Sequence, residues 1–163
     1  MGVRNCQELG ENLQKIIKRL MANDDLVKLL YYTGPDPLGA ENLSMEQKQT
    51  EIFEKLIKTA PYVGTKDTAN SVVVVYVQGA RKIPGNKEFK NVRILVDVIV
   101  PMSQWYIKST NLRPFEILGK IQSSLDDKTI NGLGKMVGGD FELNFTTNDV
   151  VCYQQVYEIT EYD

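Results

Sequence analysis

Two runs of β-branched residues in the middle of the chain decide the fold. Residues 72–77 read VVVVYV, and residues 92–100 read VRILVDVIV, in which every second residue is apolar. Runs of this kind are typical of strands buried in a sheet. The segment between them contains PGN at 84–86, which is a turn signal. The two runs therefore predict a long antiparallel hairpin, with Asp97 on a partly exposed face.

The residues before this hairpin, 1–60, are predicted to be helical. Apolar residues recur at helical spacing from Leu9 to Leu20, and Asn23-Asp24-Asp25 then provides a stop and the N-cap of a second short helix. The segment YYTGPDP at 31–37 ends that helix. Ser44-x-x-Gln47 is a capping box that opens a third helix, which is predicted to continue to Lys58 before Pro61. Its predicted apolar face consists of Met45, Ile52, Phe53, Leu56 and Ile57.

The residues after the hairpin predict one more helix and a second hairpin. Pro114 suits the first turn of a helix, and the apolar stripe of that helix is Phe115, Leu118, Ile121 and Leu125. The glycine-rich stretch 132–139 is predicted to be a flexible connector. It leads to alternating residues at 141–146 and 151–159. The predicted order of elements is α-α-α-β-β-α-β-β. It corresponds to a single α+β domain over 1–163, with helices in 1–60 and two hairpins with an intervening helix in 71–163. The predicted sheet is mainly antiparallel and four-stranded, with helices packed on one face.

Composition excludes several classes of protein. The chain has 163 residues, 19 Lys and Arg against 21 Asp and Glu, and no His. The lack of His excludes Ser-His-Asp and Cys-His catalysis and His-ligated metals within this chain. Cys6 and Cys152 allow one disulfide by number, but nothing else indicates secretion. No apolar run is long enough to span a bilayer, so a protein without a membrane partner, made in the cytoplasm, is expected.

No constellation of residues predicts catalysis or a cofactor. The sequence GLGKMVGG at 132–139 has Met136 where a phosphate-binding loop needs Ser or Thr, and Val137 where a dinucleotide fingerprint needs Gly. The carboxylate pair Asp126-Asp127 has no third ligand and is interpreted as a solvated turn. The chain is therefore predicted not to be an enzyme and to bind no metal or cofactor.

A basic cluster around the tip of the first hairpin is the candidate interface. It consists of Arg81, Lys82, Lys87 and Lys90, with Phe89 among them. Three interpretations remain open: a solvated loop, a docking surface for a protein partner, or a contact with the DNA backbone. In the docking interpretation the charges steer association and Phe89 is the anchor.

The pattern resembles the tail terminator and tail-completion proteins of tailed bacteriophages, which act at the neck between head and tail. The resemblance rests on LLYY at 29–32 followed by PDPL at 35–38, on the hairpin that ends near Pro101, and on a helix opened by Arg113-Pro114. The predicted C-terminal hairpin also matches the order of elements in tail terminator proteins. The segment from Pro35 to Leu43 and the long first helices are also compatible with a neighbouring neck component, such as a stopper or connector protein.

The resemblance implies a structural virion protein without catalytic residues. It implies a ring, usually of six copies, that caps the tail tube, contacts the tube protein and the head connector, and lets DNA slide through. Sheet edges at 71–77 and 150–159 are the predicted contacts between copies. The alternative function is a regulatory module that binds a small molecule or nucleotide through the glycine segment.

Overall fold

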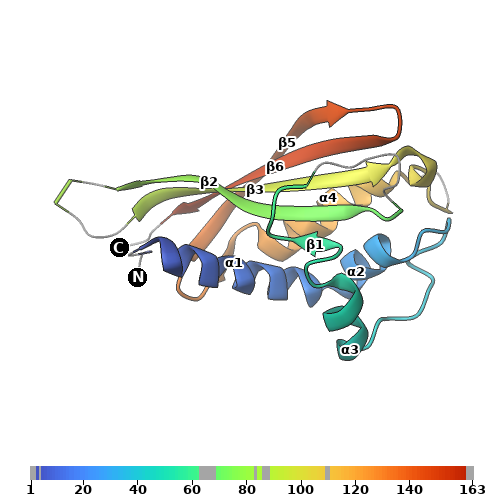
Figure 1. The fold of residues 1–163 in the computed structure, drawn as a ribbon, viewed down its shortest axis with the longest axis horizontal. Helices are drawn as coiled ribbons and strands as arrows, with labels where there is room; N and C mark the ends of the chain where they lie inside the picture. The colour runs from blue at the N-terminus through green and yellow to red at the C-terminus, as the bar shows by residue number, and fades with distance from the viewer. Residues whose placement is uncertain are drawn as a thin grey trace.

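The sheet of the computed structural model is mixed and has the strand order β1-β2-β3-β6-β5-β4 (Figure 1). The structure describes residues 3, 5–62, 69–82, 84–85, 89–108 and 111–160. Strand β1 pairs with β2 in parallel, and the other neighbours pair antiparallel. The strands are β1 (Ile57–Lys58), β2 (Val72–Lys82), β3 (Phe89–Pro101), β4 (Lys128–Ile130), β5 (Gly134–Thr146) and β6 (Val150–Thr160).

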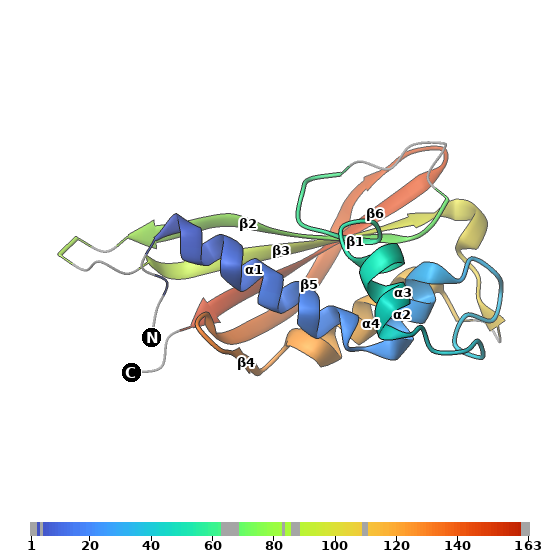
Figure 2. The same ribbon diagram turned by 60° about the horizontal axis from the view of Figure 1, so that its bottom comes forward.

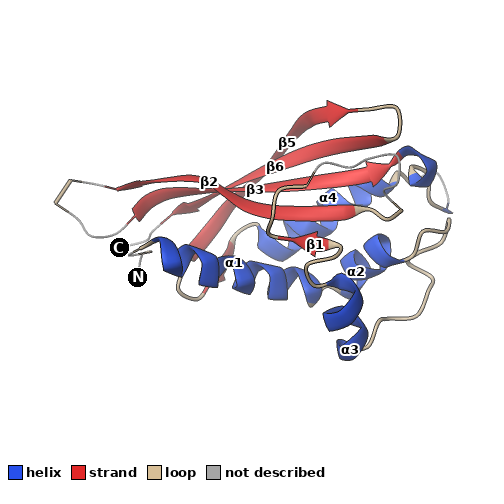
Figure 3. Ribbon diagram, viewed as in Figure 1, coloured by secondary structure: helices blue, strands red, loops and turns tan. Residues whose placement is uncertain are grey.

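The long helices pack on one face of this sheet (Figures 2 and 3). They are α1 (Cys6–Met21), α2 (Asp24–Tyr31) and α4 (Arg113–Leu125), and the shorter turns are α3 (Met45–Gln47), a π-helical turn η1 (Lys48–Ile52) and a 3₁₀ turn η2 (Met102–Gln104). Among the described residues, no helix combines the length and the apolar character needed to cross a membrane. The helices and the sheet form a single α+β domain with the helices on one face, and this prediction is confirmed.

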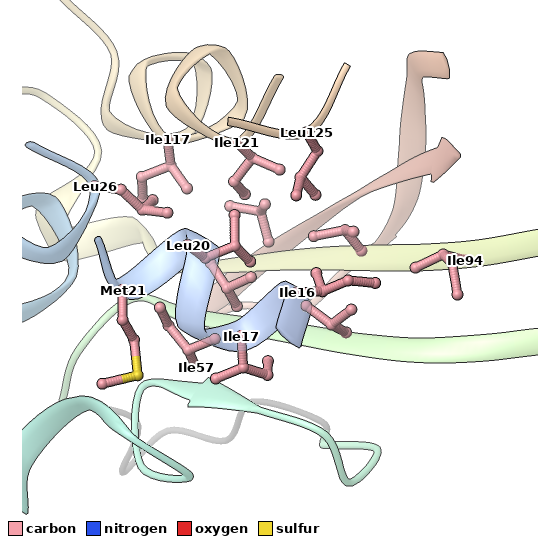
Figure 4. Close-up of a cluster of buried hydrophobic side chains, with 14 of the residues drawn as sticks. Ile16, Ile17, Leu20, Met21, Leu26, Ile57, Ile94, Ile117, Ile121 and Leu125 are labelled. Atoms are coloured by element: carbon pink, nitrogen blue, oxygen red, sulfur yellow. The ribbon is translucent and has the colours of Figure 1, made fainter. Parts of the chain in front are cut away.

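The main core lies between the helices and the sheet (Figure 4). The predicted stripe of α1 contributes Ile16, Ile17 and Leu20, which are fully buried. The helix begins after Asn5, whose side chain accepts a hydrogen bond from the Glu8 N–H, and Asn23 caps α2 in the same way. The second helix thus begins at its predicted cap, and the apolar stripe of α1 covers the sheet.

The sheet has more strands than the four that were predicted, because two short segments join its edges. The capping box of Ser44 is present, but the helical turns end at Ile52 and Glu54 has a left-handed backbone conformation with φ 56°. The chain then forms β1, and the N–H of Val73 donates to the carbonyl of Leu56 at 2.8 Å. The predicted third helix is therefore wrong beyond Ile52. Met45, predicted to be on its apolar face, is 71% exposed.

The glycine stretch is part of the sheet, so the predicted flexible connector is wrong. Strand β4 turns through residues 131–133 into β5, and Gly132 in that turn has φ +83°. Gly138 has φ +153°, and a Cβ there would overlap the carbonyl oxygen of Val156 on β6. Glycine is needed at 138 because the neighbouring backbone approaches too closely for any side chain.

A buried arginine joins the helices to the sheet connections. Arg113, the first residue of α4, is completely buried, and its guanidinium donates hydrogen bonds to four backbone carbonyls. The acceptors are Leu29 at 2.6 Å, Tyr32 at 2.9 Å, Gly34 at 2.7 Å and Gln104 at 2.9 Å. Burial lowers the pKa of Arg113. The carbonyls at the end of α2 carry the negative end of the helix dipole, which compensates the buried positive charge.

We expect Arg113→Met to destabilise the protein by about 3 kcal/mol or more, because several buried carbonyls lose their donor. Equilibrium urea unfolding measures the change. The matched control is Arg93→Met, since the Arg93 side chain is half exposed and its removal should cost less than about 0.5 kcal/mol. Equal unfolding free energies for the two variants would contradict this role of Arg113.

Candidate functional site

The predicted interface residues lie on an arm formed by β2 and β3, which extends past the N-terminal end of α1 (Figure 1). Arg81 and Lys82 are exposed there. Lys87 lies outside the described residues, and the backbone of Lys90 belongs to β3. Phe89 is half buried, packs against the main core, and its N–H donates to the Val3 carbonyl at 2.7 Å. The Phe89 ring is thus held by its own chain, and the interface role of these residues stays a prediction.

The face of the sheet opposite the helices contains a buried polar cluster, which we call the Asp97 cluster. The Asp97 carboxylate accepts hydrogen bonds from the hydroxyl of Tyr76 at 2.9 Å and from the amide of Gln154 at 2.8 Å. The same amide donates to the Tyr76 oxygen at 3.0 Å. Asp97 is only 7% exposed, so the predicted partly exposed position is wrong. Neighbouring strands supply partners for its carboxylate oxygens.

The electrostatics of the Asp97 cluster keep its neighbours protonated. Burial, and then the hydrogen bond and negative charge of Asp97, raise the pKa of Tyr76 to about 12. Burial, and then the charge of Asp97, raise the pKa of the Cys152 thiol to about 12. A protonated phenol donates to the carboxylate, and a protonated thiol is a poor nucleophile. The cluster therefore has the properties of a structural tie between β2, β3 and β6.

Beside this cluster lies a groove of about 490 Å³ along β5 and β6, and we call it the acidic groove. Arg93 and Glu158, which are paired on the adjacent strands β3 and β6, line the groove and form an ion pair with 3.6 Å between Nε and Oε1. Within the described part of the chain, Asp140 and Glu142 line the groove without an ion-pair partner. The groove therefore has an excess of negative charge. Its apolar lining is Val137, Phe141 and Val156.

The helix side of the hairpin formed by β5 and β6 is only partly covered. Phe115, Phe141 and Tyr153 form an aromatic cluster with ring centroids 5.3–6.0 Å apart. Phe115 is 41% exposed and Phe141 is 50% exposed, although the stripe of α4 predicted that Phe115 would be buried. Exposed, contiguous apolar side chains are typical of interaction surfaces.

The other predicted chemical features have structural roles in the described residues. Asp126 accepts a hydrogen bond from the Gly138 N–H at 3.1 Å. Asp127 forms an ion pair with Lys135, which lowers the pKa of the carboxyl. The described residues contain no group of three His, Cys, Asp or Glu side chains able to hold a metal ion. The turn at 126–127 is therefore tied to β5 and is not simply solvated.

A protein-family model, YomW, matches residues 23–159, which is most of the chain. The chain belongs to the YomW family. The family is phage-derived and of the SPBc2 prophage type, so the protein is phage-associated. No curated protein and no solved structure matches the chain significantly.

Features that depend on contacts between distant segments of this YomW-family chain have no local sequence pattern that predicts them. Because residues 132–139 were predicted to be a flexible connector, neither the start of β5 nor the acidic groove beside it was predicted. The Asp97 cluster joins residues that lie far apart in the chain, and the only signal for it was an acidic residue inside an apolar strand. Arg113 was identified only by its place before Pro114.

We expect the two thiols of the native protein to differ strongly in reactivity. Cys6 is exposed and Cys152 is buried, and the raised pKa of Cys152 leaves little thiolate at pH 8. Ellman titration should show one fast thiol in the native protein and two in guanidinium chloride. The control Cys6→Ser should show no fast thiol in the native state. Fast reaction of Cys152 in that variant would contradict its burial.

We expect Asp97→Asn to lower the pKa of Tyr76, because the amide carries no negative charge and accepts a weaker hydrogen bond. The folded-state pKa of about 12 lies above the ordinary value of 10. The contribution of Tyr76 to stability is therefore complete below pH 10 and is lost as the pH rises towards 12. Phenolate absorbance at pH 11 should increase in Asp97→Asn relative to the wild type, and Tyr76→Phe in the same background should remove the increase. An unchanged absorbance would contradict the proposed hydrogen bond.

Proposed function

We propose that this protein is a structural component of the virion of a tailed phage, a ring subunit that terminates the tail tube and joins it to the head connector. Two lines of evidence support the proposal. The YomW family is phage-derived, and the order of helices and hairpins resembles that of tail terminator proteins. The ring would be assembled in the host cytoplasm and would contact the tube protein and a neck protein.

The observation that carries the proposal is a pair of incompletely covered sheet edges on opposite sides of the domain. Among the described residues, β1 covers β2 only at Val73 and Val74. Among the same residues, β4 covers β5 only at 134–136. Two different surfaces on opposite sides of one subunit favour head-to-tail contacts, and such contacts close into a ring when the rotation between copies allows it. The exposed aromatic cluster adds an apolar surface on the side of the domain that carries the β5 edge.

Charge is consistent with a channel through which DNA slides. The formal net charge is −2, and the acidic groove carries Asp140 and Glu142. A surface with slight negative charge does not retain a phosphate backbone. In the proposed ring, DNA therefore passes without sequence-specific binding.

The alternative, a nucleotide-binding module, depended on a glycine loop. Those glycines lie in the turn between β4 and β5 and in β5 itself. At Gly138 the space beside the backbone is occupied by β6. No feature of this segment favours a phosphate ligand, and the structural role is the better-supported proposal.

Deletion of the gene from its phage tests this function directly. We expect electron micrographs of the lysate to show tails of irregular length and heads without tails. Complementation by Met45→Asp should restore joined particles, because Met45 is exposed on α3, away from the aromatic cluster. Complementation by Phe141→Asp should fail. Normal, joined and infectious particles from the deletion would refute the proposal.

A further inference from the structure

We infer that the free edge of β5 binds the free edge of strand β2 from a second copy, so that the sheet continues from one subunit into the next. The inference rests on the proposed function, because it specifies the interface of the proposed ring. The partner is a copy of this chain, and the contact is antiparallel strand addition, in which backbone hydrogen bonds supply affinity and side chains supply register.

The two free edges are of similar length. Among the described residues, β6 is the only strand beside β5 beyond its pairs with β4, and because Asp126 accepts a hydrogen bond from the Gly138 N–H, the free edge of β5 runs from Gly139 to Thr146. Among the same residues, β3 is the only strand beside β2 from Val75 to Lys82, beyond its pairs with β1. Such edges present unpaired backbone groups to other chains. Because the edges lie on opposite sides of the same sheet, each copy can offer both.

The direction of the strands is compatible with this pairing. Strands β2, β3, β6 and β5 follow one another antiparallel across the sheet, so β2 and β5 run in opposite directions. Copies related by rotation around a ring axis would therefore bring β5 of one copy beside β2 of the next in antiparallel orientation. The covering strands β1 and β4 restrict the stagger, because only the free spans can pair. Within these spans, the proposed register places Arg81 beside Asp140.

Side chains match across this register. It brings Arg81 of one copy next to Asp140 of the other, which gives an opposite-charge pair on the side of the acidic groove. On the helix side it brings Ala80, which packs against the main core, next to Phe141, which is 50% exposed. A small residue beside an exposed ring leaves room for the ring, and both cross-strand pairs are favourable.

Irregularities in both strands make the pairing selective. Strand β2 has register shifts between Val77 and Arg81, and β5 has shifts between Gly138 and Asp140 and between Leu143 and Phe145. Bulges of this kind twist an edge and oppose pairing with unrelated strands. An edge from another copy with complementary charge, such as Arg81 opposite Asp140, is therefore the proposed partner.

Cysteine cross-linking between two variants tests the register. Ala80→Cys and Phe141→Cys are made separately in a background of Cys6→Ser and Cys152→Ser, then mixed and oxidised. Within one copy, β3 and β6 separate the two strands by about 14 Å, and the two positions are also offset along the strands because Phe141 is level with Val75, so they are too far apart for a disulfide. A disulfide-linked dimer on a non-reducing gel can therefore come only from two copies. The control mixes Ala80→Cys with Met45→Cys, because Met45 is also exposed but lies on α3.

We expect the first mixture to cross-link at least tenfold faster than the control. A charge swap gives an independent measurement: Arg81→Asp and Asp140→Arg should each weaken self-association about tenfold, and a protein with both changes should recover. Glu46→Lys, an exposed charge change on α3, should have no effect. Rings that form without cross-linking and tolerate the charge changes would overturn this interface but leave the proposed function intact. A monomer at all concentrations would also overturn it, and the deletion phenotype would then decide the function separately.

Discussion

A buried guanidinium that is bonded to backbone carbonyls constrains the helical layer. Arg113 satisfies carbonyls at the end of α2 and in the turn η2, while Asn70 donates to the next two carbonyls, of Leu30 and Tyr31. The end of α2 is thus satisfied by side chains from the start of α4 and from the segment before β2. Because each unpaired buried carbonyl would cost free energy, these segments have one favourable arrangement.

That arrangement determines which parts of the sheet stay exposed. Helices α1, α2 and α4 cover the core between β2, β3 and β6, and α4 reaches β5 at the aromatic cluster and at its C-terminal end, where Gln122 lies beside Gly139. In the outer half of β5, Phe141 is therefore covered only in part by Phe115 and Leu143 is 53% exposed, and no described strand pairs with the outer edge there. A monomer gains nothing from exposed apolar side chains on an unpaired strand. The proposed assembly with a second copy would cover these side chains.

Local patterns predicted the elements whose stability is local. The sequence predicted the stripe of α1, the caps at Asn23 and Ser44, and the hairpin of β2 and β3. These features were predictable because helix periodicity, capping and strand alternation depend on residues that are close in the sequence. The predictions failed where distant segments meet. Residues 57–58 form a strand only because β2 lies beside them, and β6, predicted to be an edge, lies between β3 and β5. The Asp97 cluster and the acidic groove depend on that strand order, so no local pattern could locate them.

The central claim is that copies of this chain associate head to tail into a closed ring. Native mass spectrometry of the wild-type protein at micromolar concentration tests it most directly. The account predicts one dominant species at an integer multiple of the 18.5 kDa chain, near six copies. It also predicts no ladder of intermediates, because each closing contact is the same interface. A monomer at all concentrations, or a dimer that does not grow further, would contradict it.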